Sequence, residues 1–429
     1  MKKYLIAAAA LAAPVALARP ALADAPAHHF GDPIKIGDGV TLDPIIDARL
    51  RWEHVDQPAT DADAVTLRLR GGFEIKHAPS HLALLAEAEG TVAPGNDYNA
   101  FPFAVATSQR RTQYSVVADP ENIELNRLQL QYKGKAVTVT VGRQRINLDD
   151  QRFVGSVGWR QNEQTFDAAR IEAKLGPVSL DGTYSISQRT IFGYDAGPRT
   201  AYDGNFVFLG AGAKLGPVNV KAFAYLLDYD LDEQAGALAT ALADTQTYGL
   251  RANTSLPLSK RVKLNLAASY ARQSDMTGSG PKFGADYVAA EGALAFYGFT
   301  ATVGYELLGS DAAAAGGAGR AFQTPMATLH KFNGWADLFL TTPNSGLQDI
   351  YGGISYGFPK VKFVKGLNAQ VTYHQFHSDT GGVDFGHEWD ASIGFKTGRI
   401  AWLAKYADYT ARGFGTDTSK FWLQAEVAF

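Results

Sequence analysis

Apolar and polar side chains alternate with a period of two residues along most of this chain. The apolar face of the last ten residues, KFWLQAEVAF, consists of Phe421, Leu423, Ala425, Val427 and Phe429. The stretches 64–76, 178–187 and 388–396 repeat the pattern. Successive side chains of a β-strand point to opposite faces, so this period predicts strands. After residue 23 the sequence has no apolar run of about 18 residues, which a transmembrane helix would need. The chain is therefore predicted to be all-β.

The two ends of the chain predict where these strands reside. Lys2 and Lys3 precede an apolar run over 5–17, and Ala21-Leu22-Ala23 matches the pattern of a signal peptidase site. An aromatic C-terminus, Phe429, on an alternating strand resembles the signal by which the barrel-assembly machinery inserts Gram-negative outer-membrane barrels. A buried edge strand of a soluble β-sandwich is the alternative. Because lipid offers no hydrogen-bonding partner, strands cross it only as a closed barrel. We therefore expect a cleaved signal peptide at 1–23, a short periplasmic N-terminal tail at 24–39 and a transmembrane antiparallel β-barrel at 40–429, located in the outer membrane.

Short and long connections alternate between the predicted strands. The sequence AKLGPV occurs at 173–178 and again at 213–218, and each Gly-Pro marks a tight turn. Longer polar segments separate the turns, for example at 92–121, 146–164 and 309–346. This alternation is typical of the short periplasmic turns and long extracellular loops of an outer-membrane barrel. One strand on each side of every short turn gives about 18 strands, a size that leaves an aqueous lumen.

Charge and residue content argue against several other classes of protein. The net charge is −3, and removal of Lys2, Lys3 and Arg19 with the signal peptide would lower it to −6, so nothing marks a nucleic-acid-binding protein. The chain has no cysteine, which excludes disulfides and thiolate metal sites. We therefore expect no nucleic-acid partner and no disulfide framework.

The histidines offer no convincing catalytic or metal site. His77 with Ser80, and His377 with Ser378, fall in predicted turns or loops, not in the strand-borne arrangement of a barrel hydrolase. His374, His377, His387 and Glu388 cluster around one loop, although rim histidines that only form hydrogen bonds are commoner than metal ligands. We predict a protein that is not an enzyme, with no metal and no cofactor.

The polar face of the predicted strands would line the lumen. Its candidate solute-binding residues are Arg49, Arg51, Arg68, Arg70, Arg127, Arg170 and Lys174. The arginines are concentrated in the first six strands. One interpretation is a track of guanidinium groups that passes anionic solutes. The other is that arginines pair with inward carboxylates such as Glu87 and Glu89 and stiffen the wall. Both interpretations remain open.

The segment GRQRINLDDQRFVGSVGWRQNEQTF, residues 142–166, interrupts the alternation with a dense polar run. Strict alternation would point Arg143 and Arg145 toward lipid, within reach of lipopolysaccharide phosphates. A β-bulge at Gly142 would instead turn both toward the lumen, and we favour it because a glycine within a strand often marks a bulge. The connection 146–164 is predicted to fold into the pore as its constriction. Its candidate contacts with the wall or the solute are Asp149, Asp150, Arg152, Arg160 and Glu163.

Two segments resemble conserved blocks of the alginate export family of outer-membrane β-barrels. They are GRQRINLDDQRFVGSVGWRQNEQTFDAARI at 142–171 and FQTPMATLHKFNGWADLFLTTPNSGLQDIY at 322–351. The resemblance implies an 18-stranded barrel with an arginine-lined pore that exports a polyuronate. The leading hypothesis is thus an outer-membrane channel that passes an anionic polysaccharide, alginate or a similar polymer. The alternatives are an uptake porin for small anionic or neutral solutes and a barrel enzyme. Outer-membrane lipid and lipopolysaccharide are the expected surroundings.

Overall fold

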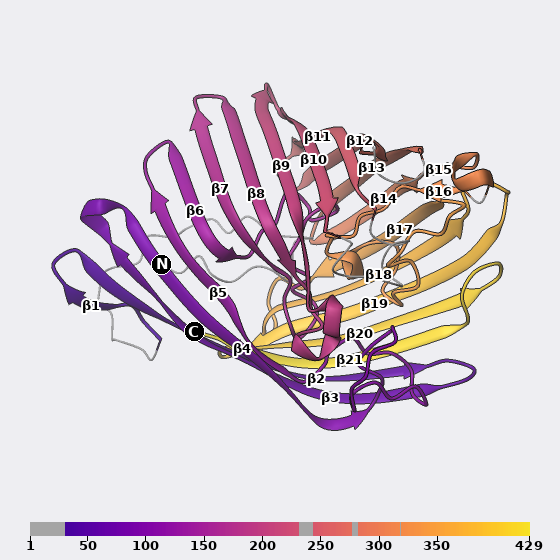
Figure 1. The fold of residues 1–429 in the computed structure, drawn as a ribbon, viewed down its shortest axis with the longest axis horizontal. Coiled ribbons are helices and arrows are strands. Elements are labelled where there is room, and N and C mark those ends of the chain that lie inside the picture. Colours follow the sequence, from indigo (N-terminus) through magenta and orange to yellow (C-terminus); the bar gives the residue numbers. More distant parts are fainter. Residues whose placement is uncertain (1–30, 231–242, 277–281, 318) are drawn as a thin grey trace.

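The computed structural model describes residues 31–230, 243–276, 282–317 and 319–429. Within these residues, 18 antiparallel strands form a closed barrel (Figure 1). The barrel strands are β2 (Val40–Asp56), β3 (Asp61–His77), β4 (Leu82–Asp97), β5 (Asn122–Lys133), β6 (Val137–Gln144), β7 (Thr165–Leu175), β8 (Val178–Arg189), β9 (Ala201–Leu215), β10 (Val218–Tyr229), β11 (Thr245–Ser259), β12 (Val262–Asp275), β13 (Gly284–Phe296), β14 (Phe299–Leu308), β17 (Leu347–Gly357), β18 (Lys365–His377), β19 (Asp384–Thr397), β20 (Ile400–Ala411) and β21 (Thr418–Ala428). Two short strands, β15 (Ser310–Asp311) and β16 (Arg320–Ala321), pair outside the barrel sheet.

The first and last barrel strands close the sheet on itself. β2 pairs antiparallel with β21 in a continuous register from Asp47 opposite Ala428 to Asp56 opposite Ser419. A closed sheet leaves no unpaired edge, which a lipid environment requires. The predicted fold class is confirmed. Within the described residues no helix is long and apolar enough to cross a membrane.

The segment predicted as an N-terminal tail contains a strand of its own. β1 (Ile34–Gly37) forms a hairpin with the start of β2, with Ile34 opposite Leu42. The predicted signal peptide, 1–23, lies outside the described residues.

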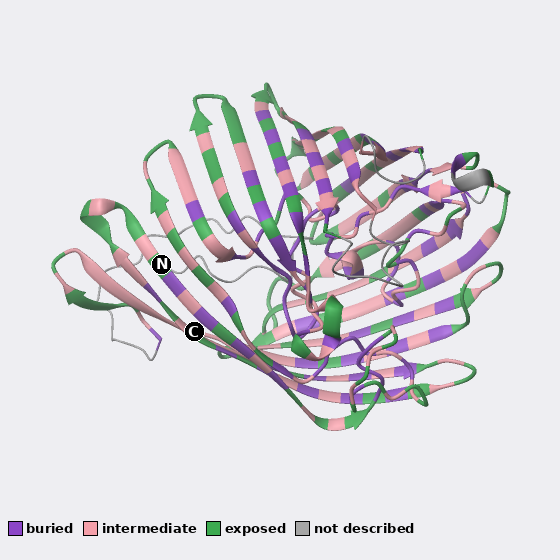
Figure 2. Ribbon diagram, viewed as in Figure 1, coloured by how far each residue is buried: buried purple, intermediate pink, exposed green. Residues whose placement is uncertain are grey.

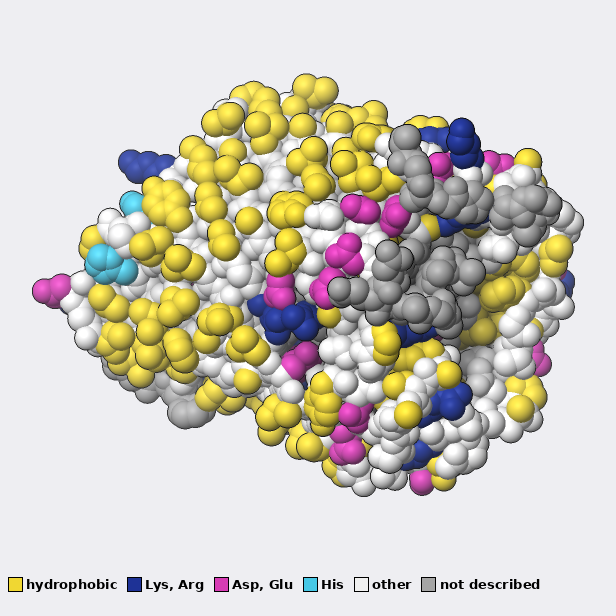
Figure 3. Space-filling view, in the orientation of Figure 1, with side chains coloured by type: hydrophobic (Ala, Val, Ile, Leu, Met, Phe, Trp, Pro, Cys, Tyr) yellow, Lys and Arg dark blue, Asp and Glu magenta, His cyan; other side chains and the backbone are white. Residues whose placement is uncertain are grey.

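The side chains alternate between the two faces of the barrel as the sequence predicts. Figure 2 shows exposed and buried residues alternating along the strands. Exposed apolar side chains on the outer face include Leu50, Leu69, Leu130, Val141, Ile171, Leu209, Leu250, Ile350 and Leu423. Figure 3 shows such side chains spread over the visible outer wall. Inward-facing Arg51, Glu53 and Arg68 are at most 1% exposed. The apolar surface thus faces lipid, and the charged groups face the interior.

The β-bulge lies one strand earlier than predicted. β6 runs in continuous register past Gly142 on both sides, so the predicted bulge there is wrong. The register shifts instead in β5, where Glu87 pairs with Arg127 but Ala88 pairs with Leu125. The extra residue of β5 explains why this strand alternates only loosely in the sequence.

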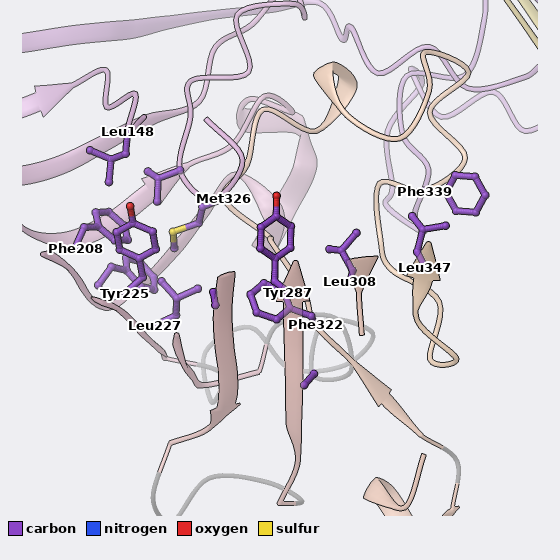
Figure 4. Packing of buried hydrophobic residues seen from close by; sticks show 14 of the residues in the cluster. Leu148, Phe208, Tyr225, Leu227, Tyr287, Leu308, Phe322, Met326, Phe339 and Leu347 are labelled. Atoms are coloured by element: carbon purple, nitrogen blue, oxygen red, sulfur yellow. The ribbon is translucent and has the colours of Figure 1, made fainter. Parts of the chain in front are cut away.

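Among the connections that fold into the barrel interior, we single out two and call them the inserted loops. The first inserted loop comprises residues 145–164, between β6 and β7, and the second comprises residues 322–346, between β16 and β17. A single hydrophobic cluster joins them to inward-facing side chains of the wall. Figure 4 shows Leu148 of the first loop and Phe322, Met326 and Phe339 of the second within this cluster. A large part of the predicted aqueous lumen therefore holds a packed core.

The half-buried ring of Phe153 packs against this cluster. Its centroid is 5.1 Å from that of Phe223, 5.2 Å from Tyr287 and 5.9 Å from Phe322. Edge-to-face and tilted aromatic pairs at such distances add to the free energy of burial. Phe153 thereby anchors the first inserted loop to β10, β13 and the second inserted loop.

Candidate functional site

The predicted arginines of β2 hold the first inserted loop by its backbone. Arg49 Nη1 donates to the carbonyl oxygen of Gly158 at 3.0 Å, and Arg51 Nη2 donates to that of Trp159 at 2.5 Å. Arg49 also pairs with Glu426 of β21 at 3.1 Å. Arg51 lies over the Trp159 ring, 4.1 Å from its centroid. Both guanidinium groups are thus bound to a loop that reaches them from the far end of β6.

The arginines of β3 are paired with carboxylates. Arg68 pairs with Asp47 and Glu426, and Arg70 pairs with Glu89 and with Glu163 of the first inserted loop. Burial of an uncompensated charge costs several kcal/mol, so such partners are required. Of the two predicted alternatives, these side chains fit the one in which the arginines pair with carboxylates and stiffen the wall.

Glu163 accepts hydrogen bonds or ion pairs from three different parts of the chain, two of them cationic. Arg70 reaches it from β3, Arg145 from the start of the loop, and Asn126 donates from the β5 bulge at 3.2 Å. Although burial opposes ionisation, Arg145, Arg70 and the nearby Arg127 hold the pKa of Glu163 well below its usual range. A permanently ionised Glu163 therefore fixes the end of the first inserted loop.

Arg127 and Arg145 point inward, whereas Arg143 does not. Arg127 makes a two-point contact with Glu87, at 2.8 and 2.7 Å. Arg143 lies opposite the exposed Leu128 on the outer face and pairs there with Asp167 at 2.7 Å. Its predicted place in the lumen is wrong because β6 continues in register beyond Gly142.

Arg152 and Arg160 of the first inserted loop connect it to the second. Arg152 Nε donates to Glu306 of β14 at 2.7 Å, and its Nη2 donates to Asn333 at 3.0 Å. Arg160 Nη2 lies 2.7 Å from Asp337, and its Nη1 lies 3.4 Å from Glu53 of β2. The two inserted loops are thus cross-linked by ion pairs to each other and to opposite sides of the barrel.

Of the remaining predicted residues, Asp149 and Asp150 of the first inserted loop contact the wall, whereas Arg170 and Lys174 lie on β7. Asp149 pairs with Lys221 of β10 at 3.2 Å, and Asp150 pairs with Arg251 of β11 at 2.5 Å. Arg170 pairs with its neighbour Glu172 at 2.9 Å, apart from the inserted loops. Lys174 is exposed near the turn that follows β7. The structure therefore brings together all the predicted residues except Arg143, Arg170 and Lys174.

A lysine enclosed by tryptophans was missed by the sequence reasoning. Nζ of Lys405, on β20, lies 3.6 Å from the ring centroid of Trp335 and 4.2 Å from that of Trp159. It also lies 5.4 Å from the ring of Trp422 on β21 and donates to Nε2 of His330 at 2.6 Å. Cation–π contacts of a desolvated ammonium are worth about 2 kcal/mol or more. The period of β20 directs Lys405 to the inside of the barrel, but Trp159 and Trp335 come from the two inserted loops.

His330, which lies in the second inserted loop, packs on Trp159 of the first. Its ring stacks on Trp159 with a centroid distance of 4.4 Å and an interplanar angle of 5°. Nδ1 of His330 lies 2.7 Å from Asp337, which also faces Lys420 at 3.4 Å. We call Lys405, Trp159, Trp335, Trp422 and His330 the lysine cage.

A cavity of about 350 Å³ remains between the second inserted loop and the wall formed by β11–β14 and β17–β19. We call it the vestibule. Neutral polar side chains line it toward the end of the barrel that carries the short turns: Ser269, Thr300, Thr302, Ser355, Gln370 and Thr372. Aromatic and charged side chains line the part nearest the second loop: Tyr287, Phe332, Trp335, Tyr351, Asp150, Arg251, Glu291, Glu306, Lys331, Asp349, His374 and Asp390. No group of His, Asp or Glu in the described part of the chain has an arrangement suited to a metal ion.

Solved structures of outer-membrane proteins share this fold. OpdL of Pseudomonas aeruginosa is 15% identical with a TM-score of 0.64, and the match covers 90% of this chain and 98% of that chain. OpdK of P. aeruginosa with vanillate is 14% identical with a TM-score of 0.65, covering 90% and 98%. OccAB3 of Acinetobacter baumannii is 14% identical with a TM-score of 0.64, covering 90% and 99%. At such low identity these similarities establish the fold alone.

The sequence comparison identifies the family. No curated protein matches the chain significantly. The alginate export family matches residues 57–326, more than half of the chain. The match includes the whole block at 142–171, whereas the block at 322–351 extends beyond its end. Together with the closed barrel and its constricted lumen, this match shows that the chain is an outer-membrane channel protein of the alginate export family.

Proposed function

We propose that this protein is a diffusion channel for small polar solutes of about one or two sugar rings, taken up across the outer membrane. The observation that carries the proposal is the pair of inserted loops, cross-linked by Arg160 and Asp337, which occupy the lumen and leave the vestibule. A cavity of about 350 Å³ is at the small end of the range for small-molecule sites, about 300–1,000 Å³.

The chemistry of the vestibule supports hydroxylated solutes. Hydroxyl and amide groups such as Thr302, Ser355 and Gln370 both donate and accept hydrogen bonds, so they replace water around a sugar hydroxyl. Rings such as Tyr351 and Trp335 offer flat apolar faces beside them. A solute is thereby held through many weak contacts, which allows it to leave as well as enter.

Export of an anionic polysaccharide is the second candidate. Membership of the alginate export family and the arginines of β2 and β3 favour it. A polymer would need a continuous passage, so both inserted loops would have to leave the interior. Arg49, Arg51 and Arg70 would then exchange the loop backbone and Glu163 for polymer carboxylates.

Liposome swelling with sugars of increasing size separates the two candidates. We expect mono- and disaccharides to enter liposomes that contain the protein. Uronate oligomers of about ten units should be excluded, because they exceed the size limit that the docked loops set. Rapid entry or strong channel block by the oligomers, with no entry of monosaccharides, would favour export instead.

A matched pair of variants tests whether the vestibule is the path. Thr302 lines the vestibule on β14, whereas Thr138 faces inward on the opposite wall, on β6. We expect Thr302→Trp to slow swelling by glucose several-fold and Thr138→Trp to leave it nearly unchanged. Equal rates for the two variants would place the path elsewhere. A heat-modifiable gel shift confirms that each variant forms a barrel.

A further inference from the structure

The part of the vestibule nearest the second inserted loop carries more carboxylates than cations can compensate. Asp349 of β17, Asp390 of β19 and Glu291 of β13 all line it. A single imidazole, His374, lies between two of them: Nδ1 is 3.0 Å from Asp349, and Nε2 is 3.6 Å from Asp390. Glu291 accepts a hydrogen bond only from a neutral group, the hydroxyl of Tyr351, at 2.8 Å, among the described residues.

Asp390 is the least satisfied of these groups. It is fully buried, and neither of its carboxylate oxygens accepts a hydrogen bond within the described part of the protein. The carboxyl group of Glu388 lies beside it, and a proton shared by the two would satisfy one oxygen and leave the other without a donor. Lys405, the nearest ammonium, donates to His330 instead. A buried carboxylate oxygen without a donor is costly, so a positive charge held nearby in the vestibule would stabilise this group.

The cations of the vestibule are already engaged. Arg251 pairs with Asp150 at 2.5 Å, and Nζ of Lys331 donates to the backbone oxygen of Asp150 at 2.8 Å. Glu306 is balanced by Arg152 from the first inserted loop. At the second-loop side of the vestibule, three carboxyl groups, Glu291, Asp349 and Asp390, thus face one imidazole, His374, and this side is acidic.

Aromatic rings surround the same carboxylates. Tyr351 stacks on His374 with a centroid distance of 5.4 Å, and Trp335 and Phe332 of the second inserted loop complete the lining. The faces of aromatic rings attract organic cations, and carboxylates accept hydrogen bonds from ammonium groups. Carboxylates, aromatic faces and neighbouring hydroxyl groups together suit a hydroxylated ring that carries an amine.

Resting on the proposed uptake of small solutes, we propose that the vestibule binds cationic, amino-sugar-like solutes in preference to neutral and anionic sugars. The ammonium group lies among Glu291, Asp349 and Asp390, and the ring contacts Trp335 and Tyr351. The hydroxyl groups extend toward Thr302 and Gln370. This preference is opposite in charge to a polyuronate.

Calorimetric binding to the detergent-solubilised full chain tests the proposal. The probes are glucosamine hydrochloride, glucose and sodium glucuronate at matched ionic strength. We expect glucosamine to bind at least tenfold more tightly than either of the others, and Glu291→Gln and Asp349→Asn each to reduce that preference several-fold. Glu172→Gln, remote from the vestibule and beside Arg170, should leave it unchanged.

The outcomes separate this inference from the proposed function. Equal or tighter binding of glucuronate, or a preference for glucosamine that survives Glu291→Gln and Asp349→Asn, would overturn the amine site. Swelling of liposomes by glucose tests the channel independently of any preference. Entry of glucose without preferential glucosamine binding would therefore refute only the inference, whereas glucosamine binding without entry of any sugar would refute the channel and retain the site.

Discussion

Nζ of Lys405 lies 3.6 Å from the centroid of the Trp335 ring, which joins the barrel wall to the second inserted loop through a cation–π contact. The same ammonium lies 4.2 Å from Trp159 of the first inserted loop. One side chain on β20 therefore contacts both inserted loops in the barrel interior.

Lys405→Met tests this coupling, since it keeps the aliphatic stem and removes the cation. We expect a loss of about 2 kcal/mol or more in loop docking, because a desolvated cation–π contact is lost and Nε2 of His330 loses its donor. Single-channel recording should show a larger and noisier conductance. Lys174→Met removes an exposed lysine and should behave as wild type. Unchanged conductance in Lys405→Met would mean that the cage does not hold the loops.

The docking of the second inserted loop should weaken in mild acid. Burial lowers the pKa of His330 well below its ordinary value, opposed by Asp337 and reinforced by Lys405 and Arg160. Its ring also packs on Trp159 and Trp422. The pKa of His330 is therefore lower when the loop is docked than when it is undocked. Docking is most stable at a pH above the ordinary histidine pKa, near 6.5, and becomes less stable as the pH falls below 6.5. For each pH unit below about 6.5, and down to the pKa of the docked His330, the free energy of docking falls by about 1.4 kcal/mol.

Asp337, the acidic partner of His330, does not titrate in the same window. Burial opposes ionisation of Asp337, but His330, Lys420 and Arg160 hold its pKa well below the usual range, so it stays ionised. Conductance recorded from pH 8 to pH 5 should therefore rise as the pH falls, and His330→Gln should flatten this dependence. A variant that retained the full dependence would assign it to another group.

Gly334 lets the second inserted loop approach β19 closely. Its φ is +82°, and a Cβ there would lie 2.3 Å from Oε2 of Glu388, whose Oε1 accepts hydrogen bonds from Trp335 N and Ala336 N. We expect Gly334→Ala to destabilise docking by about 1–3 kcal/mol from the backbone conformation, plus the cost of displacing Glu388. Gly366 has a φ of +62° and no atom within 4 Å of a Cβ, so Gly366→Ala isolates the backbone effect in thermal unfolding. Equal shifts of the unfolding temperature in the two variants would exclude an effect of the close approach between Gly334 and Glu388.

Arg143 and Arg145 offer a direct test of strand register. Arg143 pairs with Asp167 on the outer face, and Arg145 pairs with Glu163 inside. Arg145→Ala should change ion selectivity and conductance, because Glu163 loses a cation that offsets its burial. Arg143→Ala should cost about 0–1 kcal/mol of stability, as for a partly exposed pair, and leave conductance unchanged. Planar-bilayer recordings measure the conductance and ion selectivity of both variants. A larger change in Arg143→Ala than in Arg145→Ala would contradict the register.

The period of two residues was enough to predict the barrel and the inward direction of Arg49 and Arg51, because it reflects a property of each strand alone. At Gly142 the period held and the predicted bulge was wrong, because a glycine permits a bulge without requiring one. The bulge formed in β5 opposite Glu87 instead. The partner of Arg160 could not be found from the pattern, because Asp337 lies 177 residues further along the chain. The lysine cage was missed because Trp159 and Trp335 lie in loops, where no period relates sequence to direction.

The contact between Arg160 and Asp337 also bears on how the molecule assembles. Residues that far apart meet only after most of the strands have been delivered, and the pair Arg49–Glu426 at the seam between β2 and β21 spans 377 residues. Contacts of such long range are slow to form, since chain entropy opposes each closure. Biogenesis should thus pass through a water-filled barrel in which the inserted loops are not yet docked. Docking of the loops, which narrows the channel, would follow membrane insertion as a late step.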